Sequence, residues 1–157
     1  MASYRCIALS TTDAMRYRAA TSDDFGYPIE RFARHETYPC RHCLCEVSGT
    51  GGMLLLSYQT PKPNSVYGHP TAIFLCAQDC ARFDRIDEIP AIVRSRHVSF
   101  RAFRSDGAML YHANELADGS DHDAAIRRIF ARDDVAFVNA HTVKAGCLLC
   151  HVEPAQG

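Results

Sequence analysis

Tryptophan is absent from the 157-residue chain, and so is any long apolar segment. The apolar stretch Cys6 to Leu9 near the N-terminus is far shorter than the core of a signal peptide. Nowhere does an apolar run reach the roughly 20 residues that an α-helix needs to cross a bilayer. These absences predict a cytoplasmic protein, in a compartment where thiols stay reduced.

Concentrated charge is also missing. The formal net charge is −1, and lysine and arginine are scattered along the chain. Binding of nucleic acid or of an anionic membrane usually depends on a clustered basic surface, so we expect neither as a partner. The sequence also lacks a Ser/His/Asp triad, a phosphate-binding glycine loop and an HExxH motif. It therefore leaves open whether the protein is an enzyme, and it identifies no other partner.

What the chain does contain is typical of an ordinary globular domain, with 47% hydrophobic and 22% charged residues. Short apolar runs alternate with turn residues, and a few segments have helical spacing. We therefore expect an α+β fold, a mostly antiparallel sheet with two or three short helices, in a single domain over residues 1–157. The expected strands include Met53–Gln59, Thr71–Cys76, Val135–His141 and Cys147–Val152, and the expected helices include Asp87–Arg96 and Ser120–Arg132.

Four further local signals predict particular structures. Asp106-Gly107 lies between two β-rich runs, which predicts a tight hairpin joining His97–Arg104 to Ala108–His112. Near the start, a strand is expected to lead into a helix capped by Thr11 or Thr12. The less distinct signals are a strand at Arg31–Glu36 and a glycine-rich loop at Ser48–Gly52.

Eight cysteines are the most informative feature of the sequence. Cys40-x-x-Cys43 and Cys147-x-x-Cys150 each have the spacing of a zinc knuckle, which presents two thiolates to one tetrahedral ion. Together the two pairs predict a structural zinc site formed by Cys40, Cys43, Cys147 and Cys150. This site requires the fold to bring an early loop against the last strand.

The cysteines allow other interpretations. Cys76 and Cys80 can complete or replace part of a metal site, although Cys76 at a strand end also fits the core, and Cys45 can substitute for Cys43. Unligated buried thiols are equally compatible with the sequence, because free cysteine is among the most buried residue types. A thiol–disulfide function is disfavoured, since no helix is expected after Cys43. Haem attachment at Cys147–His151 is disfavoured by the expected strand and location.

Two arginines suggest a second hypothesis. Arg101 lies inside an apolar strand and Arg41 lies beside the first cysteine pair. A buried guanidinium needs an anion, which is either an acidic side chain or the carboxylate or phosphate of a ligand. The alternative to a zinc-binding module is therefore an enzyme or small-anion-binding protein with a pocket near Arg41 and Arg101. Several histidines are candidate ligands or bases, although a single histidine is more often structural: His35, His42, His112, His141 and His151.

The most specific segments are Tyr38-Pro39-Cys40-Arg41, Arg101 within Ser99–Phe103, and Gly146-Cys147. Through these segments, the chain from Tyr4 to Val152 resembles the uncharacterised bacterial domain-of-unknown-function family 1203. The resemblance implies a small, single-domain α+β protein. It implies no activity, substrate or catalytic residue.

Overall fold

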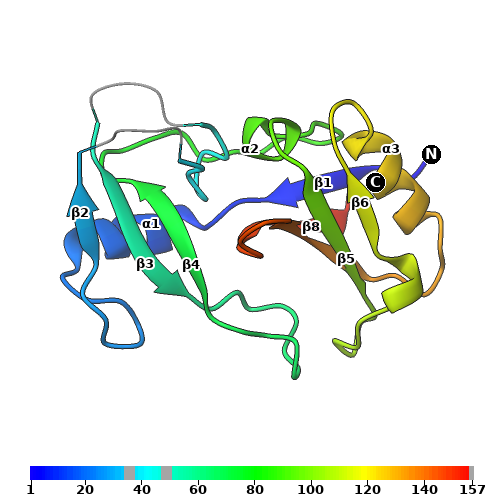
Figure 1. Ribbon diagram of the computed structural model, residues 1–157, viewed down its shortest axis with the longest axis horizontal. Coiled ribbons are helices and arrows are strands. Elements are labelled where there is room, and N and C mark those ends of the chain that lie inside the picture. The colour runs from blue at the N-terminus through cyan, green and yellow to red at the C-terminus, as the bar shows by residue number, and fades with distance from the viewer. Residues whose placement is uncertain (34–37, 47–50, 156–157) are drawn as a thin grey trace.

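The computed structural model describes residues 1–33, 38–46 and 51–155, which form two antiparallel sheets at opposite ends of the molecule (Figure 1). The larger sheet has the order β1-β8-β7-β5-β6, and the smaller has the order β2-β3-β4. The strands are β1 (Tyr4–Ile7), β2 (Glu30–Phe32), β3 (Met53–Tyr58), β4 (Thr71–Cys76), β5 (Val98–Phe103), β6 (Glu115–Ala117), β7 (Phe137–Thr142) and β8 (Leu148–Pro154). The described helices are α1 (Thr11–Ala19), α2 (Ala91–Arg94), α3 (His122–Phe130) and the 3₁₀ turn η1 (Tyr111–Ala113). The predicted α+β class is confirmed.

Helix α3 covers one face of the five-stranded sheet. Its residues Ala125, Ile126 and Ile129 recur at helical spacing and are fully buried. They join a core cluster with alternate residues of β5, among them Phe100. The opposite face of β5 carries Arg101, which is half-buried. Among the described helices, none is long and apolar enough to cross a membrane.

Helix α1 packs against the three-stranded sheet. The Ser10 hydroxyl accepts a hydrogen bond from the Asp13 N–H at 3.0 Å, so Ser10 caps the helix. The predicted cap at Thr11 or Thr12 was wrong by one or two residues, because Ser10 is the residue with extended backbone and Thr11 is already helical. Ala14 and Tyr17 are buried in a second, smaller core with residues of β3 and β4.

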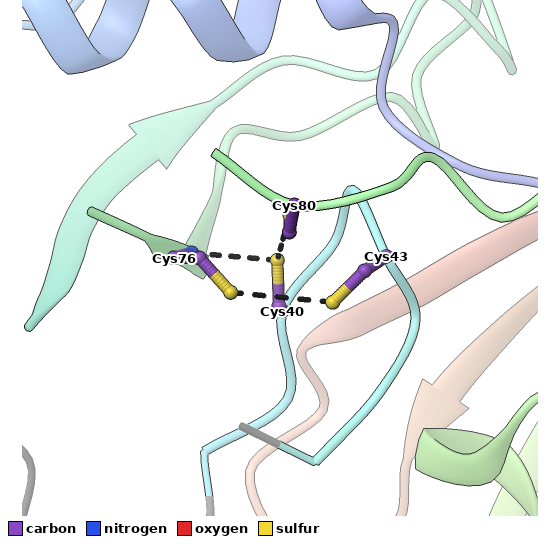
Figure 2. Close-up of side chains that lie close together, drawn as sticks. All are labelled: Cys40, Cys43, Cys76 and Cys80. Atoms are coloured by element: carbon purple, nitrogen blue, oxygen red, sulfur yellow. Dashed lines mark hydrogen bonds between the residues drawn. The ribbon is translucent and has the colours of Figure 1, made fainter. Parts of the chain in front are cut away.

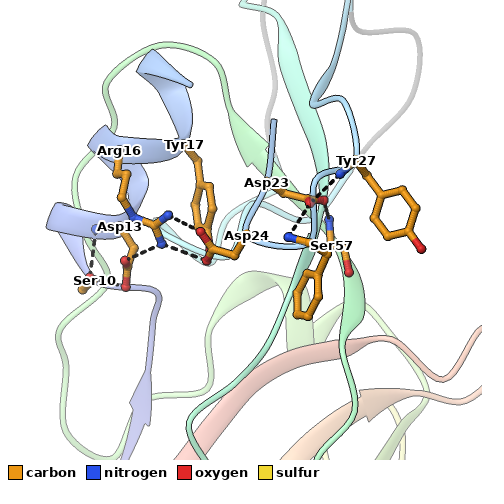
Figure 3. A network of polar contacts seen from close by, with 9 residues as sticks. Ser10, Asp13, Arg16, Tyr17, Asp23, Asp24, Tyr27 and Ser57 are labelled. Atoms are coloured by element: carbon orange, nitrogen blue, oxygen red, sulfur yellow. Dashed lines mark hydrogen bonds and ion pairs between the residues drawn. The ribbon is translucent and has the colours of Figure 1, made fainter. Parts of the chain in front are cut away.

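A polar network fixes the turn that follows α1 onto β3 (Figure 3). The buried Asp23 carboxylate accepts hydrogen bonds from three backbone N–H groups, those of Phe25, Tyr27 and Ser57, at 2.9–3.1 Å. The neighbouring Asp24 accepts a hydrogen bond from the Tyr17 hydroxyl at 2.7 Å. The position of α1 is thereby set relative to the small sheet.

Most predicted elements are confirmed with small changes of boundary, including both strands of the β3–β4 pair. The predicted tight hairpin at Gly107 forms, but its second strand is short. Phe103 and Met109 make one antiparallel bridge, and the N–H groups of Arg104 and Leu110 donate to the carbonyls of Ala108 and Ala102 at 3.0 and 2.8 Å. The expected strand Ala108–His112 was wrong only beyond Leu110, because Tyr111–Ala113 is a 3₁₀ turn. Further along, Asn114 Oδ1 accepts the N–H of Ala102 at 2.8 Å, and β6 pairs with the first half of β5, from Val98 to Phe100.

β2 begins one residue before the predicted strand Arg31–Glu36 and shares Arg31 and Phe32 with it. Residues 34–37, which include His35, and residues 48–50 of the glycine-rich loop are outside the described part.

Candidate metal centre

The segment Cys40–Cys45 folds into a tight turn. The Leu44 N–H donates to the Cys40 carbonyl at 2.9 Å, and the Cys40 N–H donates to the Cys45 carbonyl at 3.2 Å. Leu44 adopts a left-handed φ of 51°, a conformation that favours glycine. Its side chain is fully buried, and that burial offsets the backbone cost.

This turn is held against the end of β4. The Arg41 N–H donates to the Phe74 carbonyl at 3.1 Å, next to a parallel bridge between Cys40 and Phe74. Because β4 ends two residues later, Cys76 lies beside Cys40, and its N–H donates to the Cys40 sulfur at 3.3 Å. The chain leaving β4 then brings Cys80 to the same place.

The four thiols of Cys40, Cys43, Cys76 and Cys80 converge on one point (Figure 2). Their sulfur atoms all lie within 4.8 Å of one another, and the pairs Cys40–Cys80 and Cys43–Cys76 are each separated by 4.0 Å. Four sulfurs around one zinc ion, with Zn–S bonds of about 2.3 Å, would lie about 3.8 Å apart. All four are free cysteines, and their spacing is compatible with a shared metal ion.

Polar groups around the cluster favour negative charge on the sulfurs. Cys80 receives a hydrogen bond from the Arg18 guanidinium at 3.3 Å, and its sulfur is 3.1 Å from Nδ1 of the buried His42. The other ring nitrogen of His42 lies 3.0 Å from the Thr11 hydroxyl. Outer hydrogen bonds of this kind orient metal ligands and stabilise their charge. His42, a candidate ligand in the sequence, instead bridges α1 to Cys80.

The thiols also differ in their acidity. The pKa of Cys40 is lowered to about 6, mainly by a hydrogen bond from Cys43 and to a smaller extent by one from Cys76. The pKa of Cys80 is held well below its usual value. The largest cause is a hydrogen bond from Cys40, and the other two cysteines and His42 act in the same direction. Donation to Cys40 raises the pKa of Cys43 and of Cys76. The site therefore favours the thiolate form at Cys40 and Cys80, and the thiolate is the form of cysteine that binds metals.

The structure brings together two of the four ligands predicted from the sequence. Cys40 and Cys43 belong to the cluster, whereas Cys147 and Cys150 lie outside it among the described residues. Cys150 is buried in the larger core, where its thiol, together with burial, raises the pKa of Cys6. Cys147 is half-buried just before β8, and its N–H donates to the Thr142 hydroxyl at 3.0 Å.

The early loop nevertheless lies against the last strand, as the predicted site required. The Arg41 Nε donates to the Leu148 carbonyl at 2.8 Å. This contact is made by the arginine, while the thiols of the same turn face β4. The sequence signal that identifies the remaining cysteines of the cluster is the Cys76-x-x-x-Cys80 spacing after a strand.

Cys45, the suggested substitute for Cys43, is exposed, and its thiol donates to the Cys43 carbonyl at 3.3 Å.

The two arginines of the second hypothesis line separate cavities. Arg41 is buried beside a cavity of about 260 Å³ and donates to the carbonyls of Leu148 and Pro39. Burial lowers the pKa of Arg41 to about 10. Arg101 lines another cavity, of about 380 Å³. In the described part of the chain, neither guanidinium forms an ion pair with a carboxylate.

Fold and site together define a small α+β domain with a four-cysteine cluster at the end of β4, in the smaller core. Residues 37–154 match the family described as a protein of unknown function (DUF1203), and the chain belongs to this family. The matched region contains all four clustered cysteines. No curated protein and no solved structure matches the chain.

Proposed function

We propose that Cys40, Cys43, Cys76 and Cys80 bind a structural Zn²⁺ ion that fixes the junction between the two sheets. The observation that carries this proposal is the convergence of four free thiols, contributed by two separate segments, within 4.8 Å of one another. Four thiolates are a soft, tetrahedral donor set, which suits zinc. Because four protein ligands fill a tetrahedral shell, the site is structural rather than catalytic.

The place of the turn in the fold explains why a metal would stabilise the protein. Cys40 is part of the smaller core, whereas Leu44 is buried in the larger one. The Leu44 carbonyl accepts the N–H of Ile92 in α2 at 3.2 Å. A metal bound to this turn would hold both cores to one rigid point, and its binding free energy would add to the stability of the fold.

The smaller core also has a particular need for such support. It consists of three strands and one helix, and a unit of this size buries too little apolar surface to be stable alone. Small domains commonly add a metal or disulfides to compensate. Reduced thiols are kept in the cytoplasm, so the proposal is consistent with the location inferred from the sequence.

Metal analysis of protein purified without added metal tests the proposal. We expect about one zinc per chain, and less than about 0.1 equivalent would contradict it. The Cys80→Ser variant should lose the zinc, because a hydroxyl replaces one of four thiolates.

Cys147→Ser is the matched control. Cys147 is a half-buried thiol like Cys80 but lies outside the cluster, so this variant should keep its zinc. Loss of zinc from Cys147→Ser and retention by Cys80→Ser would overturn the assigned ligand set. An iron content in place of zinc would contradict the identity of the ion.

A further inference from the structure

A second cavity lies between the polar face of the five-stranded sheet and the segment that joins β3 to β4. Its volume is about 380 Å³, within the range of small-molecule sites. The sheet contributes residues of β5 and β7, and the connecting segment contributes an aromatic ring and a histidine. The residues that matter for its chemistry are Arg101, Asn139, His141, Phe103, Tyr67 and His69.

The lining of this cavity is positively charged. It includes Arg101 and no aspartate or glutamate among the described residues. The other cavities described each include at least one carboxylate. A cavity with this lining attracts anions.

Arg101 differs from the other half-buried or buried arginines in having no acceptor within the described part of the chain. Arg41 donates to two carbonyls and Arg18 to the carbonyl of Cys76, while Arg96 and Arg127 are paired with Glu46 and Asp123. A guanidinium carries five N–H donors in a planar fork that matches a carboxylate. Arg101 presents such donors at the wall of the cavity.

His141 does not compensate this positive charge but offers an acceptor. Its Nδ1 lies 2.9 Å from the Gly146 carbonyl, and a carbonyl accepts only, so Nδ1 carries the proton. Burial lowers the pKa of His141 to about 4, and the charges of Arg101 and Arg41 act in the same direction. At neutral pH the ring is therefore neutral, and its Nε2 is free to accept a hydrogen bond.

The remaining wall is apolar and held in place. The rings of Tyr67 and Phe103 meet edge to face with centroids 6.1 Å apart. The Tyr67 hydroxyl lies 2.9 Å from that of Tyr111, which fixes the ring at the cavity edge. Met109 also lines this wall. A ligand with an apolar body and one anionic end would be complementary to these surfaces.

We propose that this cavity binds a small organic carboxylate, with its carboxylate paired to Arg101 and its hydrocarbon body against Phe103 and Tyr67. A hydroxyl or amine on the ligand would donate to His141 Nε2. Within the described ranges no hydrogen bond joins His141 to the Cys147 thiol, which also lines the cavity, so the proposal concerns binding alone. None of the four clustered cysteines lines it, so the proposal is independent of the metal centre.

Calorimetric titration of the purified protein with benzoate and with benzamide tests the proposal. The two probes have nearly the same shape and differ in charge. We expect benzoate to bind at least tenfold more tightly, because it alone can form a charged pair with Arg101. Arg101→Gln should weaken benzoate binding at least tenfold, and Arg104→Gln, which removes an exposed arginine paired with Asp106, should leave it unchanged. Equal affinities for the two probes, no benzoate binding up to about 20 mM, or an unaffected Arg101→Gln variant would overturn the proposal.

Thermal unfolding without ligand separates binding from a structural role. If Arg101 serves to bind a ligand, Arg101→Gln should leave the Tm of the ligand-free protein unchanged or raise it. The substitution removes a half-buried charge that has no acceptor in the described part of the chain. A Tm lowered by several degrees would show that Arg101 stabilises the fold and would contradict the proposal. Arg101→Lys keeps the charge but loses the planar fork, so its benzoate affinity should fall between those of the wild type and Arg101→Gln.

Discussion

Arg18 makes three contacts with the segment that carries the second pair of clustered cysteines. Its guanidinium donates to the Cys76 carbonyl at 3.0 Å, to the Asp79 carboxylate at 3.3 Å and to the Cys80 sulfur at 3.3 Å. The Arg18 side chain is only 10% exposed, so its bonds to the Cys76 carbonyl and the Cys80 sulfur are partly shielded from water, whereas Asp79 is exposed. Arg18 therefore orients Cys80 and offsets part of the negative charge of the four thiolates.

Replacing Arg18 by methionine should lower the zinc affinity by roughly 10- to 100-fold, because the orienting hydrogen bonds are lost while the apolar stem is kept. Competition with a chromogenic chelator measures this change. Arg85→Gln, at an exposed arginine paired with Glu88, is the control and should bind zinc like the wild type. Equal affinities of the two variants would show that Arg18 does not support the site.

Individual ligands could be predicted from the sequence only in part. The Cys40-x-x-Cys43 spacing identified one pair, because both thiols belong to one local turn. Cys76 and Cys80 were recognised as possible replacements, but a strand-end cysteine has the same pattern whether it binds a metal or fills a core. The contact of Arg18 with Cys80 joins residues far apart in the sequence, and no local pattern records it.

The turn after α1 shows how one side chain can fix a whole helix. Asp23 is 6% exposed and accepts hydrogen bonds from the N–H groups of Phe25, Tyr27 and Ser57. Ser57 belongs to β3, so the carboxylate links the turn to the sheet. Helix α1 in turn supplies Thr11 and Arg18 to the surroundings of the four-cysteine cluster.

The Asp23→Ala variant should lose at least about 2 kcal/mol of unfolding free energy, because three N–H groups lose their acceptor. Urea denaturation measures this loss. Asp24→Asn is the comparison, since Asp24 forms an exposed pair with Arg16 and such pairs contribute less than about 1 kcal/mol. Equal losses in the two variants would mean that Asp23 does not hold the turn in this way.

Secondary structure was predictable where the apolar pattern is continuous. The strands β3 and β4 follow unbroken apolar runs, and α3 follows helical spacing. The hairpin at Gly107 was predicted, but its second strand ends at Leu110, and beyond it the Asn114 side chain accepts the N–H of Ala102. A side chain that replaces part of a β-ladder leaves no periodic signal, so the pairing of β5 with β6 could not be predicted.

Across the whole molecule, the turn Cys40–Cys45 is the point where the two sheets meet. Arg41 reaches the start of β8, Leu44 enters the larger core, and Cys40 lies in the smaller one. The sequence predicted that an early loop meets the final strand, which the Arg41 contact confirms. It did not predict that the thiols of this loop face β4, because the choice between two neighbouring strands depends on tertiary packing.

X-ray absorption at the zinc edge of the purified protein tests the central proposal most directly. The account predicts one zinc ion with four sulfur neighbours at about 2.3 Å, and the same spectrum for the Cys147→Ser variant. A shell containing nitrogen or oxygen, a change of spectrum in Cys147→Ser, or protein without zinc would contradict it.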